Sequence, residues 1–371
     1  MEQPTISVII PLYNTEKYIG ECFDSLLAQT FQNFEVVVVD DRSTDNSVAV
    51  VKSYAEKFGG RLTLSSLKKK SNGGGSVPRN RGLELSRGEY VFFLDSDDAV
   101  TPTAFEELYK IAKDFNADVV HCEKFYQVPD KIWHDEEKRS QLKPDNYFTN
   151  DRLNVTRPVL LSKDIAKRIQ LFASKKLLWN FWLQLIRRNF LIENEIRLPD
   201  AAAQDMFFTM CELCCAKNYV IVPNVINFYR VREESVTTEN ISDEMRMHKW
   251  INTIKLSIRQ LDNFLNKIDG FSDRPDLKYI LFDTLTEQML EGLVILYNKI
   301  PPYAFDNFLR KEFAEDDNLA LMAFVFNSMN TQRLLLKKHR QEVEKFNTFA
   351  AQTQRRIAEL ENEIKRLTSK E

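Results

Sequence analysis

The sequence predicts an α/β protein in which a mostly parallel central sheet is flanked by helices, followed by a helical C-terminal region and a terminal coiled coil. Two observations support this architecture. Short, continuously apolar segments alternate with amphipathic helical segments over residues 6–94, which is typical of parallel strands that are covered on both faces. Near the C-terminus, apolar residues recur at alternating spacings of three and four, which is the spacing of a coiled-coil heptad.

Strands are expected where short apolar runs end at turn residues, and helices where apolar residues share one helical face. In chain order, the first elements are a strand over Ile6–Ile10, a helix over Tyr18–Thr30, a strand over Phe34–Val39, a helix with Val48, Val51 and Tyr54 that Thr44 or Asp45 caps, a strand over Leu62–Leu67, a helix over Val77–Leu85 and a strand over Tyr90–Leu94. Farther along we expect a strand over Asp118–Cys122, a polar insertion over Gln127–Asn154, helices resuming near Asp164, a helix over Gln204–Ala216 and a strand over Tyr219–Val222.

The character of the chain changes after Thr238. Amphipathic helices are expected over Asp243–Lys267, Leu277–Tyr297 and Ala304–Phe313. The heptad segment covers residues 343–367. Its last half has isoleucine at position a and leucine at position d, which favours a parallel two-stranded coil. We therefore expect three parts, residues 1–238, 239–335 and 336–371, and a homo-oligomer formed through residues 343–367. A solvated single helix or a disordered end is the alternative for the tail.

Composition and charge narrow the class of protein. The chain has 371 residues, 43% of them apolar, which suffices for a buried core and more than one domain, and its net charge of −3 does not suggest nucleic-acid binding. The five cysteines lack disulfide spacing, and Cys211, Cys214 and Cys215 fit a helix core better than half of a zinc site. We see neither a signal peptide nor an apolar run of the ~18 residues that a membrane span needs. We expect a cytoplasmic protein that can associate peripherally with the inner face of the membrane.

Two acidic clusters follow predicted strands. Asp40 and Asp41 follow Phe34–Val39, and Asp95–Ser96–Asp97–Asp98 follows Tyr90–Leu94. In parallel α/β sheets the ligand site lies beyond the carboxyl ends of the strands, so both clusters should line one crevice. Three carboxylates within four residues repel one another unless a cation lies among them, and hard oxygen ligands suit Mn²⁺ or Mg²⁺. A solvated acidic turn that caps the next helix is the alternative for each cluster.

The glycine-rich segment Asn72–Gly75 brings the opposite charge to this edge. It leads into the helix over Val77–Leu85, and glycine-rich turns before helices bind anions well. Arg79 carries a planar fork of donors that suits a diphosphate. Lys68–Lys69–Lys70 adds positive charge upstream, although such runs are usually only solvated.

Other nucleotide-binding classes fit the sequence less well. A nucleotidyltransferase should have a glycine-rich loop directly after the first strand, where this chain has Pro11–Leu12–Tyr13–Asn14. A dinucleotide-dependent oxidoreductase should have G-x-G-x-x-G at the same place. A non-catalytic protein that binds a nucleotide-sugar, or a scaffold oligomerised by its coiled coil, remains as an alternative to an enzyme.

Several segments, taken in order, resemble the family-2 glycosyltransferases with a GT-A fold, which is Rossmann-like. They are Ile6–Asn14, Ser25–Phe31, Glu35–Ser47, Arg79–Gly82 and Gly88–Tyr90 running into Asp95–Asp98, with a weaker match through Tyr229–Arg230 and Ser235–Thr237. The resemblance implies an inverting, metal-dependent enzyme that moves a sugar from a nucleotide-sugar, of the UDP type, to a hydroxyl of a saccharide or glycoconjugate acceptor. It also suggests a role in surface polysaccharide synthesis. It does not identify the donor sugar or the acceptor.

The resemblance also implies roles for individual residues. Asp97 and Asp95 would hold Mn²⁺ or Mg²⁺ as the Asp-x-Asp element. Asp205 would be the catalytic base that removes the proton of the acceptor hydroxyl, although the family usually has Glu-Asp where this chain has Gln204–Asp205. The donor would be bound by Pro11, Tyr13, Asp41, Arg79, Asp95, Asp98 and Arg232, with Asp41 facing a uracil-type ring and Arg232 reaching the diphosphate.

Overall fold

The computed structural model describes residues 3–71, 74–144, 153–200, 204–232, 242, 245, 256–269, 271 and 273–297, with residues 288–297 described by their backbone only. By compactness the chain divides into two units, residues 1–296 and 297–371. The expected boundaries after residues 238 and 335, the helix over 304–313 and the heptad over 343–367 lie outside the described residues.

A nine-stranded sheet forms the centre of the first unit, in the order β3-β2-β1-β4-β8-β6-β9-β5, with β7 beside β9. The first four strands in this order run parallel, β8 is antiparallel to both its neighbours, and β6 is parallel to β9. The strands are β1 (Ile6–Leu12), β2 (Phe34–Asp40), β3 (Leu62–Ser66), β4 (Tyr90–Phe93), β5 (Ala99–Val100), β6 (Val119–Pro129), β7 (Val159–Leu160), β8 (Gln184–Arg187) and β9 (Tyr219–Val231). The predicted α/β fold with flanking helices is confirmed, and β8 makes the complete sheet mixed.

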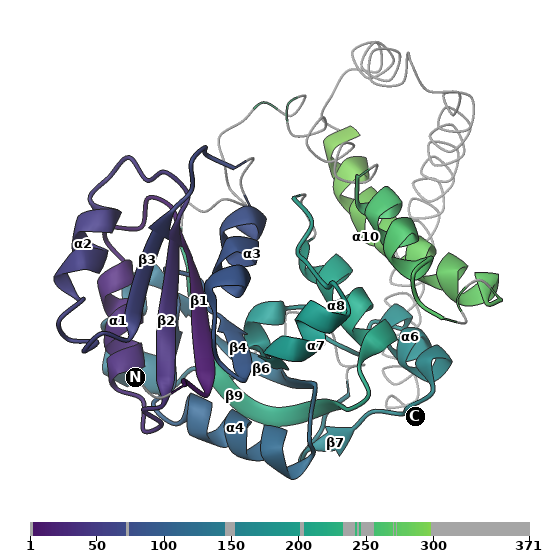
Figure 1. Ribbon diagram of the computed structural model, residues 1–371, viewed down its shortest axis with the longest axis horizontal. Coiled ribbons are helices and arrows are strands. Elements are labelled where there is room, and N and C mark those ends of the chain that lie inside the picture. The colour runs from purple at the N-terminus through teal and green to yellow at the C-terminus, as the bar shows by residue number, and fades with distance from the viewer. Residues whose placement is uncertain are drawn as a thin grey trace, which may run out of the picture. The chain divides into compact units, whose positions relative to one another are not determined.

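Helices cover both faces of the parallel strands (Figure 1). The helices of the described part include α1 (Ile19–Leu27), α2 (Ser47–Ser53), α3 (Ser76–Leu85), α4 (Ala104–Asp114), α5 (Glu136–Ser140), α6 (Ile165–Ala173), α7 (Arg188–Glu193), α8 (Gln204–Cys215) and α10 (Pro275–Tyr297), with short 3-10 helices η1 (Asp130–Ile132) and η2 (Phe181–Leu183). Figure 1 shows α1 and α3 on opposite sides of β1–β3. Side chains of adjacent strand residues point to opposite faces. Phe92 accordingly contacts Phe105 of α4, with ring centroids 5.5 Å apart, while Phe93 contacts Phe208 of α8 at 5.9 Å.

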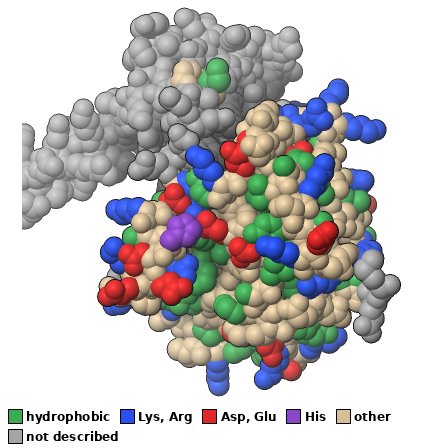
Figure 2. Space-filling view, turned by 90° about the vertical axis from the view of Figure 1, so that its left-hand side faces the viewer, with side chains coloured by type: hydrophobic (Ala, Val, Ile, Leu, Met, Phe, Trp, Pro, Cys, Tyr) green, Lys and Arg blue, Asp and Glu red, His purple; other side chains and the backbone are tan. Residues whose placement is uncertain are grey.

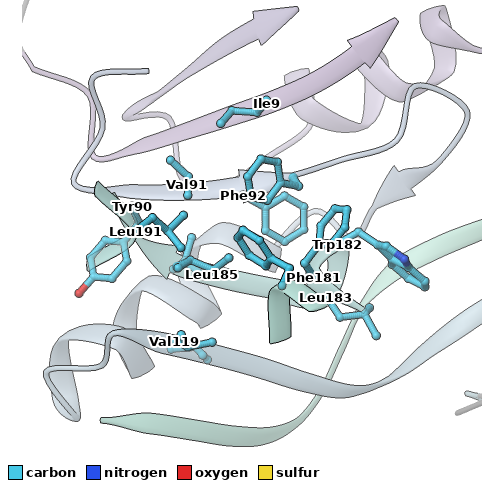
Figure 3. Packing of buried hydrophobic residues seen from close by; sticks show 14 of the residues in the cluster. Ile9, Tyr90, Val91, Phe92, Val119, Phe181, Trp182, Leu183, Leu185 and Leu191 are labelled. Carbon is cyan, nitrogen blue, oxygen red and sulfur yellow. The ribbon is translucent and has the colours of Figure 1, made fainter. Parts of the chain in front are cut away.

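The junction of β4, β8 and β6 joins the two halves of the sheet (Figure 3). Leu185 of β8 pairs with Phe92 on one side and Val120 on the other, and Phe181 packs edge-on against Phe93 at 5.4 Å. Sequence periodicity indicated helices from about Asp164 and no strand before Tyr219, because a short apolar run does not distinguish a strand from a buried helix. The strand β8 is therefore a correction to that expectation.

The strands β6 and β9 are longer than predicted. They continue to Pro129 and Val231, past the expected ends at Cys122 and Val222, because they pair with each other along their length. Irregular register between Cys122 and Tyr126 disturbs the alternation that would have revealed them. The expected polar insertion from Gln127 therefore begins inside β6.

The cysteines of α8 belong to the core. Cys211 and Cys214 are buried free thiols, and burial raises the pKa of both well above the ordinary value, so they are protonated. The helix-core interpretation of this cluster is confirmed.

Within the described ranges, no helix is long and apolar enough to cross a membrane. Figure 2 shows acidic and basic side chains interspersed on one face of the described part, in keeping with the small net charge.

Candidate active site

The carboxyl ends of β1, β2 and β4 bring the two acidic clusters to one edge of the sheet. The backbone N–H of Asp41, just after β2, donates to the carbonyl oxygen of Leu12 at 2.8 Å. On the other side of β1, the N–H of Leu94, just before Asp95, donates to the carbonyl oxygen of Ile9 at 3.1 Å. The clusters therefore flank the end of β1, as the parallel arrangement predicts.

Asp41 does not cap the helix that follows it. Its buried carboxylate accepts hydrogen bonds from the backbone N–H and hydroxyl of Ser71, at 2.7 and 2.6 Å. The start of α2 is instead bonded by Asp45, which accepts from the N–H and hydroxyl of Ser47 at 3.0 and 2.6 Å. Asp41 thus ties the end of β2 to the segment that leads into the glycine-rich loop.

An exposed ring lies beyond the end of β1. The Tyr13 side chain is 37% exposed, and the Lys70 ammonium lies 3.9 Å from its ring centroid and also donates to its hydroxyl. This contact is a cation–π interaction. Pro11 is within β1, paired with Val39 of β2. The structure therefore gives Lys70 a specific partner, whereas the sequence pattern favoured a merely solvated lysine run.

Arg79 lies on α3 and is almost completely buried. Its Nη1 donates to the carbonyl oxygen of Gly74 at 2.9 Å, its Nη2 pairs with Asp95, and its guanidinium lies 5.0 Å from the ring centroid of Phe181. Gly75 has a φ of +76°, and a Cβ at this position would collide with Arg79 Nη1. Glycine at 75 is therefore needed both for the left-handed turn that begins α3 and for the position of the guanidinium.

The end of β9 brings a second arginine to the acidic run. Arg232 Nη2 lies 2.6 Å from Asp97 Oδ2, and each side chain is 17% exposed. The Arg232 guanidinium also lies 4.8 Å from the ring centroid of Tyr18. Burial raises the pKa of Asp97, Arg232 lowers it, and the nearby Asp95 raises it further.

Arg230 and Asp98 belong to a buried hydrogen-bond network at this edge of the sheet. The backbone N–H of Arg230 donates to Asp98 Oδ1 at 2.8 Å, and its side chain donates to the carbonyl oxygen of Asp97 at 3.0 Å, to Asp130 at 2.8 Å and to Glu21. Its guanidinium stacks 3.6 Å from the ring centroid of Trp133. Burial raises the pKa of Asp98 well above its usual range. The sequence indicated none of these Arg230 contacts, because its partners come from distant segments.

Asp205 lies in the first turn of α8, close to the charges of the acidic run. Burial raises the pKa of Asp205 to about 7; the Arg79 guanidinium lowers it, Asp95 raises it, and a hydrogen bond from Trp182 lowers it. The structure thus brings Asp205, Arg79 and Asp95 into one electrostatic environment. A carboxylate that titrates near neutral pH is suited to removing a proton at physiological pH.

Gln204 attaches the start of α8 to the glycine-rich loop. Its Nε2 donates to the carbonyl oxygen of Gly74, and its Oε1 accepts from the hydroxyl of Ser76. Gly74 therefore accepts hydrogen bonds from both Gln204 and Arg79. A glutamate could not make the first of these bonds while ionised, so the departure from Glu-Asp changes how the two helices are joined.

The acidic run fits a divalent cation that a diphosphate helps to bind. Its donors are hard carboxylate oxygens, and Asp98 Oδ2 is buried with no hydrogen-bond partner in the described part of the chain. Among the described residues, no three potential ligands gather as a complete cation site. Mg²⁺ commonly takes one or two protein carboxylates together with substrate phosphates, and Asp97 and Asp95 are the residues that would hold it.

Known proteins match this chain by sequence, mainly over its first half. Residues 7–169 match the family model of glycosyl transferase family 2. The uncharacterised glycosyltransferase YibD of Escherichia coli is 35% identical over 207 residues, which is 55% of this chain and 55% of the relative. The poly(ribitol-phosphate) beta-N-acetylglucosaminyltransferase TarP of Staphylococcus aureus is 30% identical over 220 residues, covering 58% of this chain and 59% of TarP. The chain thus spans less than two thirds of the length of these relatives.

A solved structure supports the fold. S. aureus TarS, residues 1–349, in complex with UDP-GlcNAc, matches with a TM-score of 0.61 and 22% identity, over 82% of this chain and 81% of that chain. At this level of identity the match concerns the fold alone. Residues 7–169 of this chain are therefore similar to glycosyl transferase family 2, and the chain shares the GT-A fold of TarS.

Proposed function

We propose that the chain is an inverting, metal-dependent glycosyltransferase that moves a sugar from a nucleotide-sugar, of the UDP type, to a hydroxyl of a saccharide or glycoconjugate. The observation that carries this proposal is the proximity of Asp205, with a pKa raised to about 7, to the Arg79–Asp95 ion pair. A proton acceptor thus lies beside groups suited to a diphosphate, which is what a sugar transfer with a nucleotide leaving group requires.

The residues divide the work between the two ends of the reaction. Asp205 accepts the proton of the acceptor hydroxyl as that oxygen attacks the anomeric carbon, a contribution typically worth about 10²–10⁴-fold in rate. Arg79 and Arg232 supply positive charge for the diphosphate that leaves from the opposite side. A divalent cation, when bound by Asp97 and Asp95, neutralises part of the same charge. One displacement of this kind inverts the anomeric centre, and no second carboxylate is needed as a nucleophile.

The nucleoside is assigned to the other side of β1. Tyr13, Pro11 and Asp41 surround the expected position of the base, and the exposed Tyr13 ring is suited to stacking. Asp98 accepts a hydrogen bond from the backbone of Arg230 and so helps to hold the end of β9 at the site. This assignment is part of the proposal and is tested by UDP binding to Asp41→Ala.

The acceptor class is inferred from named relatives. TarP acts on poly(ribitol-phosphate), as does a poly(ribitol-phosphate) beta-glucosyltransferase of Bacillus spizizenii that is 28% identical over 285 residues, 72% of this chain and 40% of the relative. We extend this to surface polysaccharide synthesis by a cytoplasmic enzyme at the inner face of the membrane. We also propose that residues 343–367 form a homo-oligomer, which sedimentation of the full chain and of a chain ending at residue 335 would test.

A donor screen tests the enzyme proposal. The full chain is incubated with a panel of UDP-sugars, Mn²⁺ and oligosaccharide or ribitol-phosphate acceptors, and release of UDP is measured. Asp97→Ala and Asp205→Ala should lose the release, whereas Arg274→Ala should retain it, because the exposed Arg274–Asp276 pair uses no residue of the site. UDP release that is equal in the wild type, Asp97→Ala and Asp205→Ala would favour the non-catalytic binding or scaffold alternative.

A further inference from the structure

Two arginines at the end of β9 are held in different ways. Arg230 is only 4% exposed and is fixed by Asp98, the carbonyl of Asp97, Asp130 and the Trp133 ring. Arg232 is held among the described residues by one ion pair, with Asp97, and by the Tyr18 ring. Its buried Nε has no hydrogen-bond partner in the same part of the chain. Among the described residues, Arg232 is therefore held by fewer contacts than Arg230, and its displacement breaks one ion pair there.

The partner of Arg232 is the carboxylate best suited to a metal ion. A guanidinium 2.6 Å from Asp97 Oδ2 neutralises the charge that would attract a cation, and it takes up one of the positions around that oxygen at which a cation could bind. A cation and Arg232 both carry positive charge and repel each other at this distance. Each therefore weakens the binding of the other at Asp97 Oδ2.

We propose that Arg232 is an internal counter-ion of Asp97 that a divalent cation must displace, so that cation binding releases the guanidinium. This inference rests on the proposed function in one respect, which is that the ligand is a nucleotide diphosphate. The released Arg232 becomes available to that diphosphate. In the unliganded protein, Arg232 weakens the binding of the cation alone. When a nucleotide diphosphate is present, its negative charge attracts the displaced arginine, and the cation and the nucleotide favour each other's binding.

Mn²⁺ binding to the full chain without nucleotide tests this competition. Free Mn²⁺ is measured by electron paramagnetic resonance for the wild type, Arg232→Gln, Arg232→Lys and the control Arg274→Ala. Arg232→Gln should bind Mn²⁺ about three- to tenfold more tightly, because a partly buried ion pair of this kind is removed. Arg232→Lys should stay near the wild type, since it keeps the charge, and Arg274→Ala should match the wild type. Unchanged or weaker binding by Arg232→Gln would overturn the proposal.

Chemical labelling of the wild-type protein gives a second test that does not depend on a folded variant. Arginines are modified with phenylglyoxal, with and without Mn²⁺, and the labelled peptides are quantified by mass spectrometry. Mn²⁺ should increase the labelling of Arg232 severalfold and leave that of the exposed Arg274 unchanged. Equal labelling of Arg232 in both samples would contradict its release.

The two tests are separate from the test of enzymatic activity. Neither requires sugar transfer, so the competition can fail while UDP release succeeds, and the reverse. Asp97→Asn should abolish high-affinity Mn²⁺ binding in the first test. Mn²⁺ binding that persists in Asp97→Asn would also overturn the proposal, because the cation would then lie elsewhere.

Discussion

The pH dependence of turnover tests the assignment of Asp205 as the base. A base must be ionised to accept a proton, and burial raises the pKa of Asp205 to about 7. With a pKa of about 7, roughly one tenth of the molecules carry the ionised carboxylate at pH 6 and roughly nine tenths at pH 8. The value of kcat/KM, which reports the ionisation of groups in the free enzyme, should therefore rise about tenfold between these two pH values.

The perturbation that sharpens this test is Arg79→Gln. The Arg79 guanidinium lowers the pKa of Asp205, so its removal should raise that pKa and move the rise in kcat/KM to higher pH. The assay is UDP release at donor concentrations well below KM, and each pH profile is scaled to its own maximum, so that weaker donor binding by Arg79→Gln does not alter the pH at which the rise occurs. Asp205→Asn should lower kcat/KM by about 10²–10⁴-fold and remove the dependence on pH.

The reasoning would be refuted by a kcat/KM that stays level from pH 6 to pH 8, or by a rise centred near the ordinary aspartate pKa of about 4. A rise that moves to lower pH in Arg79→Gln would refute the sign of the charge effect. Arg274→Ala is the control and should follow the wild-type profile. Circular dichroism at each pH confirms that the protein stays folded.

Three other substitutions test separate parts of the fold and the site. The pKa of Asp205 is raised in the folded state, so the wild type loses stability as pH rises towards 7. Asp205→Asn should therefore stabilise the protein at pH 8 by on the order of 1–3 kcal/mol and leave its stability unchanged below pH 4. Calorimetry that finds no gain at pH 8 would contradict this. Gln204→Glu removes the donor to the Gly74 carbonyl and should lower the free energy of unfolding by about 1–2 kcal/mol. Unfolding in urea measures this change, and an unchanged free energy would show that the hydrogen bond contributes little to stability. Glu212 is fully buried, and its pKa is raised well above the usual value. The wild type should therefore lose stability as pH rises above about 4.5, and Glu212→Gln should lose less stability over the same range. An equal loss of stability with pH in the two proteins would contradict a buried neutral Glu212.

The parallel half of the fold was predictable because its signals are local. The strands β1, β2 and β4 are continuous apolar runs, since helices cover both of their faces, and each ends close to where the sequence predicted. The strand β8 was not predicted, because it consists of four residues inside an aromatic segment without alternation. The ends of β6 and β9 were missed because their pairing, rather than their composition, makes them strands.

The candidate site divides in the same way. Sequence order alone placed Asp41 and Asp95 at strand ends, and so at one edge of the sheet, because parallel strands share their carboxyl edge. Residue spacing could not show that Asp41 is bonded by Ser71, that Arg79 pairs with Asp95, or that Lys70 contacts Tyr13. These contacts depend on loop conformations, which local sequence patterns do not specify.

What the sequence by itself determined is the order of the parallel strands β1 to β4 and of the helices between them, the family resemblance and the identity of the chemical groups at the sheet edge. Only the tertiary structure decided how those groups neutralise one another. Asp97 and Arg232 are separated by more than a hundred residues, and their ion pair exists because the β9 strand ends beside the loop that follows β4. The pKa of Asp205 likewise depends on burial and on Arg79, neither of which has a signature in the residues around position 205. Charge interactions act through space, so their effect on the site appears only when the chain is folded.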